Sequence, residues 1–352
     1  MNENLKNVQA ETVQSEESHG GEYILEVEHL KKYFPLKKSL TGKVQVYVHA
    51  VEDVSFKLKR GSVLGIVGES GCGKTTMGRT LLKLYDITDG KVYFNGEDIT
   101  HYSKSQMRKL RPQLQVIFQD PYSSLSPRMT VGEIIGEAVL QHKIVPKNEI
   151  RDYVVKVMES CGLRPYYYNR YPHEFSGGQR QRICIARAVA LNPQLIVCDE
   201  PVSALDVSVQ AQIINLLKNL QEQHGLSYIF ISHDLSVVKH ISNEVGVMYL
   251  GSMVEKGPTD KIFDEPLHPY TKALLSAVPV PDPRSKMNRI ILKGDIPSPA
   301  NPPSGCKFHT RCDHCMEICK TVSPEFIERG EGHFVACHLY DEEQKDIEKE
   351  QG

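Results

Sequence analysis

The stretch GESGCGKT, residues 68–75, constrains the fold of this chain more than any other part of its sequence. It fits the pattern G-x-x-x-x-G-K-[ST], with the apolar run VLGIV before it and the amphipathic run TMGRTLLKL after it. This is the strand–loop–helix context in which the pattern binds nucleotide phosphates. Its glycines let backbone N–H groups turn toward phosphate oxygens, and the helix N-terminus adds positive partial charge. The residues predicted to bind nucleotide here are Gly68, Glu69, Ser70, Gly71, Cys72, Gly73, Lys74, Thr75 and Thr76.

Two short motifs carry the expected chemistry. In the loop, we expect the Lys74 ammonium to reach the β- and γ-phosphates of ATP and the Thr75 hydroxyl to bind Mg²⁺. The run LIVCDEP places Asp199 and Glu200 at the carboxyl end of an apolar strand. There Asp199 can hold Mg²⁺, usually through water, and Glu200 can polarise the attacking water. Adjacent acids after an apolar run also occur by chance, so the prediction of an ATP-hydrolysing site depends on the presence of both motifs.

The pattern of apolar residues predicts an α/β fold. Five runs that are apolar on both faces indicate buried parallel strands, and they span residues 63–68, 114–118, 195–199, 228–232 and 245–250. The runs EYILEVEHL, AVEDVSFKL and KVYFNG alternate more, which favours an antiparallel sheet. Between about residues 120 and 190 the apolar period becomes helical, so a helical subdomain is inserted between strands. The stripe from Ile213 to Leu220 indicates another helix, with Gly225 as its C-cap.

Composition narrows the class of protein. The 352 residues are 40% hydrophobic and 24% charged, as in soluble globular proteins of about two domains. No apolar run approaches the ~18 residues of a membrane span, and the polar, acidic residues 1–21 indicate a disordered lead rather than a signal peptide. The net charge of −2 gives no support to nucleic-acid binding. We expect a reducing, cytosolic environment unless a partner docks the chain elsewhere.

The run FSGGQRQR, residues 175–182, opens a predicted helix with a second anion-binding terminus. Together with SALD at residues 203–206 and His233 at the end of YIFIS, it resembles the ATP-binding cassette of ABC transporters over residues 24–260. The resemblance implies a RecA-like core with an antiparallel β subdomain and a helical subdomain. It also implies a head-to-tail dimer, in which the signature motif of one subunit closes on the γ-phosphate held by the other. The nucleotide-binding residues that it adds are Ser176, Gly177, Gly178, Gln179 and Asp206.

Three further roles come from the same resemblance. Gln119 matches the glutamine that touches Mg²⁺ and the attacking water, and His233 matches the switch histidine at the γ-phosphate. Phe175 stands where leucine is usual, and we expect no loss of activity from that change. An aromatic side chain before the phosphate loop stacks on adenine in such cassettes; Tyr33 is our choice, with Phe34 and Tyr47 as alternatives.

The chain continues beyond the common cassette with HPYTKALLSAVPVPDP, a proline-rich passage and GCKFHTRC. With FQDPYSSLSPRMTV at residues 118–131, these runs resemble the ATP-binding subunits of bacterial oligopeptide/dipeptide importers, and the DppF/OppF branch more than the DppD/OppD branch. The resemblance implies a sister ATP-binding subunit, two integral-membrane permeases and an extracytoplasmic peptide-binding protein, with this chain at the cytoplasmic face of the membrane. Nickel or sugar import, or a non-transport ABC ATPase, are the alternatives.

The expected domains are a lead at residues 1–21, a nucleotide-binding domain at residues 22–262 and a C-terminal extension at residues 263–352. Seven prolines between Pro279 and Pro303 predict an extended linker within this extension, and everything after it forms an appendage.

Nine cysteines fall into two groups. Cys72, Cys161, Cys184 and Cys198 are most simply buried apolar side chains. The extension has little core of its own, so its thiolates suggest a metal that supplies folding energy. Zinc prefers C-x₂₋₄-C pairs, which only Cys315 can form with its neighbours. The resemblance to the importers implies instead a structural [4Fe–4S] cluster. The alternatives are a zinc site, thiols that bind no metal, and disulfide bonds. The ligands of the cluster would be Cys306, Cys312, Cys319 and Cys337.

We expect nucleotide binding to survive loss of such a cluster, because the cysteines lie far from the cassette motifs in the sequence.

Overall fold

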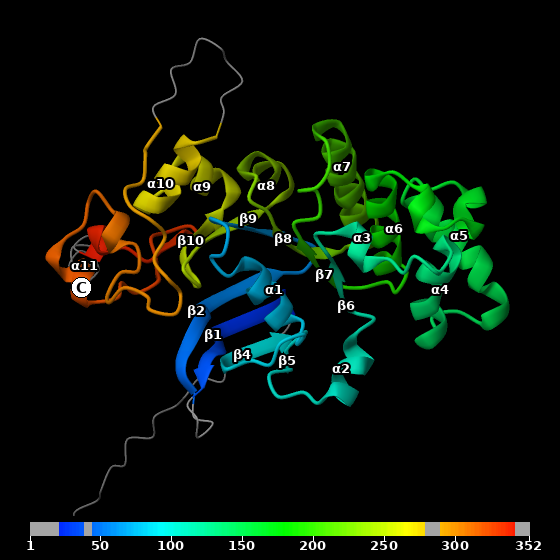
Figure 1. Ribbon diagram of the computed structural model, residues 1–352, viewed down its shortest axis with the longest axis horizontal. Coiled ribbons are helices and arrows are strands. Elements are labelled where there is room, and N and C mark those ends of the chain that lie inside the picture. Colours follow the sequence, from blue (N-terminus) through cyan, green and yellow to red (C-terminus); the bar gives the residue numbers. More distant parts are fainter. Residues whose placement is uncertain (1–20, 39–43, 279–288, 342–352) are drawn as a thin grey trace, which may run out of the picture.

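A mixed eight-stranded sheet forms the centre of the molecule in the computed structural model, which describes residues 21–38, 44–278 and 289–341 (Figure 1). The strand order is β11-β12-β10-β9-β3-β8-β7-β6. The five runs predicted to be parallel strands are confirmed as β3 (Val63–Val67), β6 (Leu114–Ile117), β7 (Leu195–Asp199), β8 (Ser227–Ile231) and β9 (Glu244–Tyr249). Every residue of β3, β7 and β8 is buried, which explains why these runs are apolar on both faces.

A second, antiparallel sheet has the order β2-β1-β4-β5, as the alternating runs predicted. Its strands are β1 (Tyr23–Lys38), β2 (Val44–Lys59), β4 (Asp89–Phe94) and β5 (Glu97–Asp98). The helix α1 (Lys74–Leu81) lies between the two sheets (Figure 1). Its Met77 and Leu81 belong to one buried apolar cluster with Val54 of β2 and Leu64 of β3. Burial on both sides fixes the start of α1, and therefore the phosphate loop that precedes it.

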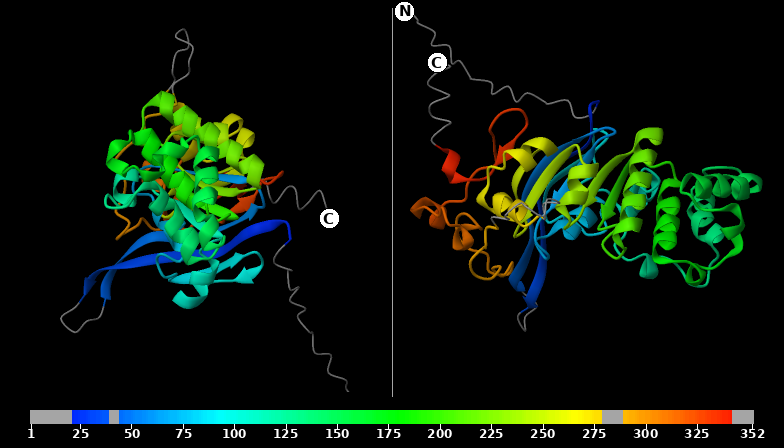
Figure 2. Two further views of the ribbon diagram at one scale, coloured as in Figure 1. Left: turned by 90° about the vertical axis from the view of Figure 1, so that its right-hand side faces the viewer. Right: turned by 90° about the horizontal axis from the view of Figure 1, so that it is seen from above.

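The predicted helical subdomain lies between β6 and β7. It contains α3 (Pro121–Ser124), α4 (Val131–Gln141), α5 (Ile150–Ser160) and α6 (Gly177–Val189), with short 3₁₀ turns at Lys147–Glu149, Pro165–Asn169 and Pro172–Glu174. Thr130 caps α4, because its side chain accepts from Glu133 N while the Glu133 carboxylate accepts from Thr130 N. Figure 2 shows this subdomain projecting from one end of the molecule.

The remaining elements before residue 279 belong to the cassette or, from residue 263, to the start of the predicted C-terminal extension. They are α2 (Lys104–Leu110), α7 (Val207–His224), α8 (Leu235–Ile241), β10 (Ser252–Pro258), α9 (Thr259–Asp264) and α10 (Pro269–Ser276). The C-cap predicted at Gly225 is confirmed by its left-handed backbone, with φ of 62°. Among the helices of the described ranges, none has the length and apolar character that crossing a bilayer requires.

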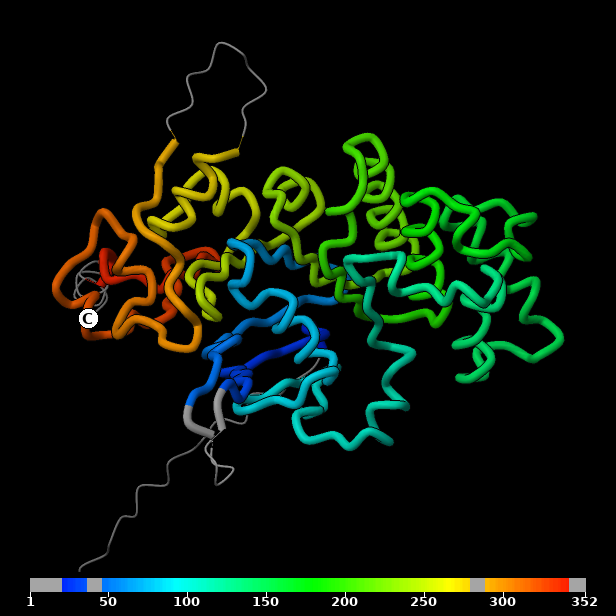
Figure 3. Tube along the Cα trace, viewed as in Figure 1, coloured from blue at the N-terminus to red at the C-terminus, as the bar shows by residue number. Residues whose placement is uncertain are grey.

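The C-terminal extension joins the central sheet. Its elements are a turn at His309–Arg311, α11 (Glu317–Thr321), β11 (Ile327–Glu328), β12 (Phe334–Val335) and a turn at His338–Tyr340. Val335 of β12 pairs with Glu255 of β10, so the extension adds two strands to the cassette sheet. The extension and the helical subdomain lie at opposite ends of the molecule (Figures 1 and 3).

The described part of the predicted linker, residues 289–303, contains no helix or strand, while residues 279–288 lie outside the described ranges. The lead predicted for residues 1–21 also lies outside them, except for its last residue.

Candidate nucleotide site

The phosphate loop is folded around the ammonium of Lys74. Lys74 is 5% exposed, and its Nζ donates to the carbonyl oxygens of Gly68 at 2.7 Å and Glu69 at 3.0 Å. Gly73 has a φ of 106°, and a Cβ there would lie 2.1 Å from the carbonyl oxygen of Ala50, so only glycine fits this position. The loop therefore holds a cation at the helix N-terminus, as the sequence predicted for a phosphate site.

Thr75 and Asp199 meet beside this loop. The Thr75 hydroxyl donates to Asp199 Oδ1 at 2.7 Å, while Asp199 Oδ2 is buried without a hydrogen-bond partner. Burial raises the pKa of Asp199, and the hydrogen bond from Thr75 and the nearby Arg79 guanidinium, 3.5 Å away, lower it. A hydroxyl and a partly unsatisfied buried carboxylate are hard oxygen donors, so the residues present fit Mg²⁺.

Glu200, Gln119 and His233 meet at the carboxyl edge of the central sheet. They follow the neighbouring strands β7, β6 and β8, and parallel strands end at the same edge. Glu200 Oε2 accepts from Gln119 Nε2 at 3.0 Å and lies 3.4 Å from His233 Nδ1. Glu200 has a φ of 48°, in the left-handed region that residues other than glycine adopt infrequently. The structure thus brings together the three side chains that the sequence assigned to water and the γ-phosphate.

The signature motif lies elsewhere in the chain. Ser176 caps α6 by accepting from Gln179 N, and Gly177 and Gly178 form the first turn of that helix. Figure 1 shows α6 in the helical subdomain, away from α1 and the phosphate loop. Asp206 caps α7 by accepting from Val209 N at 2.9 Å.

The aromatic side chains considered for adenine lie on the β1–β2 hairpin. Tyr33 is half-buried, its hydroxyl donates to Glu52, and its ring lies 4.3 Å from that of His49. Of the two alternatives, Tyr47 lies 6.5 Å from Tyr33, and Phe34 packs edge-on against Tyr85. The assignment of the base-stacking residue stays a prediction.

Two residues of the site were missed by the sequence analysis, and both come from after the common cassette. The hydroxyl of Tyr270 accepts from Glu69 N at 2.8 Å. The guanidinium of Arg311 donates to both carboxylate oxygens of Glu69, at 2.7 Å and 3.0 Å. One signal was available in the sequence: Glu69 is the only acidic residue of the loop at residues 68–76, and a carboxylate beside a phosphate site needs a cation.

The cysteines of the extension gather in space. Cys306 N donates to Cys319 O at 2.8 Å. Burial and, to a smaller extent, the neighbouring thiols of Cys306, Cys312 and Cys319 raise the pKa of Cys337 to about 12. All nine cysteines are free thiols. Within the described ranges, however, no three or more His, Cys, Asp or Glu side chains are arranged around a common metal position, so the metal-bound form of the extension stays a prediction.

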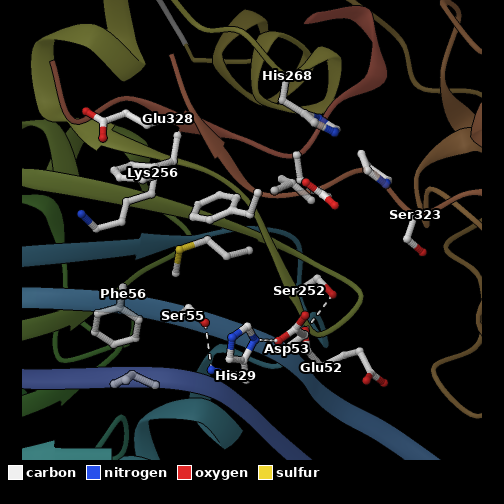
Figure 4. A pocket seen from close by; sticks show the side chains of 18 of the residues that line it. His29, Glu52, Asp53, Ser55, Phe56, Ser252, Lys256, His268, Ser323 and Glu328 are labelled. Carbon is white, nitrogen blue, oxygen red and sulfur yellow. Dashed lines mark hydrogen bonds and ion pairs between the residues drawn. The ribbon is translucent and has the colours of Figure 1, made fainter. Parts of the chain in front are cut away.

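A cavity of about 1580 Å³ is lined by residues of the β1–β2 hairpin, of β10 and of the extension. Figure 4 shows Ser323 of the extension on one side and His29, Glu52 and Asp53 of the hairpin on the other. The phosphate-loop residues do not line this cavity, nor do Asp199 or Glu200, so it is separate from the nucleotide site.

The fold and the site define an ATP-binding cassette. The family model described as ABC transporter matches residues 51–203, and the one described as the C-terminal region of oligopeptide/dipeptide transporters matches residues 254–319. Among solved structures, cbiO1 of Clostridium perfringens, part of the ABC transporter complex cbiONQ, matches with a TM-score of 0.61 and 28% identity over 70% of this chain and 92% of its own.

Relatives whose names specify a transported solute narrow the class of ABC transporter. The chain is 56% identical to the oligopeptide transport ATP-binding protein AppF of Bacillus subtilis (strain 168), over 91% of this chain and 98% of that protein. It is 48% identical to the dipeptide transport ATP-binding protein DppF of Escherichia coli (strain K12), over 91% of this chain and 96% of that protein. The chain belongs to the family of ATP-binding subunits of oligopeptide/dipeptide ABC transporters.

Proposed function

We propose that this chain hydrolyses ATP to power the import of di- and oligopeptides, at the cytoplasmic face of the membrane. The observation that carries the proposal is the meeting of Glu200 with Gln119 and His233 beside the Thr75–Asp199 pair. The peptide cargo is supported by the relatives whose names specify oligopeptide or dipeptide transport. Nickel or a sugar is the alternative cargo, because an ATP-binding subunit does not touch the solute.

The residues divide the reaction between them. Lys74 binds the β- and γ-phosphates, and Glu200 accepts a proton from the attacking water. Gln119 orients that water, and His233 contacts the γ-phosphate from the end of the next strand. Mg²⁺ bound by Thr75, Asp199 and Gln119 would neutralise the charge that develops on the phosphate oxygens.

The active form is a head-to-tail dimer with a sister ATP-binding subunit. Ser176 and Gln179 lie on a helix that is apart from this chain's own phosphate loop, so a second cassette has to supply the signature motif to each site. The ATP-binding cassette MJ0796, which is 26% identical with a TM-score of 0.60, is dimeric in a post-hydrolysis state bound to ADP and Pi. Two permeases and an extracytoplasmic peptide-binding protein complete the transporter.

The extension holds a structural [4Fe–4S] cluster in this proposal, with zinc as the alternative. Cys306 N donates to Cys319 O at 2.8 Å, and the thiols of Cys306, Cys312 and Cys319 are close enough to Cys337 to raise its pKa. Four thiolates are the donor set that such a cluster requires. The cluster would fix the fold of the extension. Protein purified without oxygen should contain about four irons and four sulfides per chain; stoichiometric zinc without iron would contradict the cluster and keep a metal-folded extension.

The function is tested in the complete transporter reconstituted in vesicles, with a labelled oligopeptide and ATP. Glu200→Gln should keep ATP binding and lose hydrolysis together with peptide uptake, because the general base is replaced by an amide of equal size. Glu222→Gln, an exposed change of the same kind on α7, is the matched control. Full ATPase activity in Glu200→Gln would remove Glu200 from the mechanism, and ATP hydrolysis that no peptide stimulates would contradict peptide import.

A further inference from the structure

The segment 306–312 of the extension packs directly against the phosphate loop. Phe308 is 1% exposed and contacts Tyr249 edge-on, with ring centroids 5.2 Å apart. The Nζ of Lys307 donates to Leu250 O at 3.1 Å and to Ser252 Oγ at 2.7 Å. The loop and the extension are therefore neighbours, although most of the chain separates them in sequence.

The turn that Lys307 supports also contacts the phosphate loop. Gly251, between the two acceptors of Lys307, donates its N–H to the carbonyl oxygen of Cys72 at 2.8 Å. Arg311, four residues after Lys307, binds the carboxylate of Glu69 near the start of the loop. The segment thus supports the loop at two places, one directly and one through the β9–β10 turn.

Glu69 is held at all three of its polar groups. Its N–H donates to the Tyr270 hydroxyl, its carbonyl oxygen accepts from Lys74 Nζ, and its carboxylate is bound at both oxygens by Arg311. The carbonyl contact matters most for the reaction, because it fixes one of the two oxygens between which the Lys74 ammonium lies. The contact of Arg311 with Glu69 is therefore linked, through the Glu69 carbonyl, to the Lys74 ammonium that is expected to bind the phosphates.

Charge gives Arg311 a second effect on the same site. Glu69 is the only acidic residue of the loop, and its side chain is only 25% exposed. An unpaired carboxylate there would oppose the binding of a polyphosphate anion. The guanidinium is 7% exposed and donates to both carboxylate oxygens, so its positive charge cancels that of the carboxylate.

We propose that Arg311 is a positioning residue for nucleotide binding, which acts through Glu69 mainly by neutralising the carboxylate beside the phosphate loop. This inference rests on the proposed ATP-binding function and adds to it that the site is incomplete without the extension. It also replaces the expectation that the cysteine region is independent of nucleotide binding, because Arg311 directly precedes Cys312.

The test measures binding of a non-hydrolysable ATP analogue, with Mg²⁺, to the purified full-length chain by titration calorimetry. Arg311→Gln should weaken binding about tenfold, which equals about 1.4 kcal/mol. Glu69→Gln alone should bind within threefold of the wild type or more tightly, since Arg311 then adds an uncancelled positive charge. The double variant should recover most of the loss, because neither charge remains.

The double variant separates the effect of the uncancelled Glu69 charge from a defect in folding. A merely structural defect in Arg311→Gln would not be relieved by a second change that also breaks the pair. Arg311→Lys keeps the charge without the two-point contact and should lose at most threefold. In the assembled transporter, Arg311→Gln should raise the KM for ATP more than it lowers kcat. The control is Lys293→Gln, which breaks the exposed pair with Asp313 in the same extension and should leave binding unchanged.

Several outcomes would overturn the inference. Binding by Arg311→Gln within twofold of the wild type would do so. An equal loss in Arg311→Lys and Arg311→Gln, or no recovery in the double variant, would exclude the charge effect. If Arg311→Gln does not fold, the comparison of Arg311→Lys with the wild type decides, and a tenfold loss there contradicts the proposal. Failure of the wild-type chain to bind the analogue would instead contradict the proposed function.

Discussion

Replacing Phe308 by alanine should destabilise the whole molecule. The ring lies among Tyr249, Tyr270 and His268, at centroid distances of 5.2, 5.4 and 5.6 Å, and only 1% of the residue is exposed. Removing a fully buried phenylalanine ring costs about 3–5 kcal/mol, because apolar burial is lost and the remaining cavity is only partly filled. The loss is a large part of the free energy of unfolding of an ordinary domain, about 5–15 kcal/mol.

The size of the effect depends on the extension unfolding together with the cassette. Phe308 belongs to the main apolar cluster of the molecule, and β12 pairs with β10. Urea unfolding of the full chain, followed by circular dichroism, should therefore show a lower midpoint with an unchanged slope. The control Tyr166→Ala removes an aromatic ring that is 55% exposed, and it should change the free energy of unfolding by no more than about 0.5 kcal/mol.

Two results would refute this reasoning. A loss below about 1 kcal/mol would mean that the ring is not held as the aromatic contacts indicate. A separate early transition, with the cassette unfolding at its usual urea concentration, would show that the extension is an independent unit that merely touches the phosphate loop.

Three further predictions concern the partner site, acid stability and the thiols. In transporters that carry one mutant subunit, Ser176→Arg should stop hydrolysis at the sister subunit's phosphate loop and spare the site that contains Lys74; a defect confined to the Lys74 site would contradict the head-to-tail dimer. Burial lowers the pKa of His268 to about 4. As the pH falls below about 6.5, this histidine becomes protonated in the unfolded chain while it stays neutral in the folded chain. The free energy of unfolding should therefore fall by about 2 kcal/mol between pH 7 and pH 5 through His268 alone. Urea unfolding at both pH values measures this change, and a His268→Asn variant with the same pH dependence as the wild type would contradict the prediction. Cys312→Ser should remove anaerobically bound iron and speed proteolysis within the extension, whereas Cys315→Ser should do neither; equal iron loss in both would widen the ligand set.

Much of the fold was predictable because local sequence determined it. The strand before Gly68 and the helix after it determine where the phosphate loop lies. The strand β7 ends at Asp199, so Asp199 and Glu200 lie at the edge of the sheet at which the parallel strand β3 enters that loop. The meeting of Glu200 with Gln119 and His233 followed from the parallel order of three buried strands. Apolar runs that are buried on both faces indicate parallel strands of a covered sheet, but the order of those strands comes from the structure.

The contacts of the extension were not predictable in the same way. Arg311 and Glu69 are 242 residues apart, and their meeting depends on how the extension packs on β10 and α10 rather than on any local pattern. The adenine-stacking residue was also left undecided, because the pairing of β1 with β2 contains several register shifts around Tyr33. Each shift changes which side chains share a face of the hairpin, so alternation in the sequence does not determine it.

The pairing of β12 with β10 bears on how far this protein can be shortened. Without β12, the N–H and C=O groups along the outer side of β10 would lie open at the sheet margin, where they can recruit strands from other molecules. Glu255, fully buried on β10, would also lose its hydrogen bonds from Leu267 N, His268 N and the His333 ring in a chain cut after residue 262. Such a chain would keep the nucleotide motifs with an open, aggregation-prone sheet margin, so the extension protects a margin that a minimal cassette would have to cover by other means.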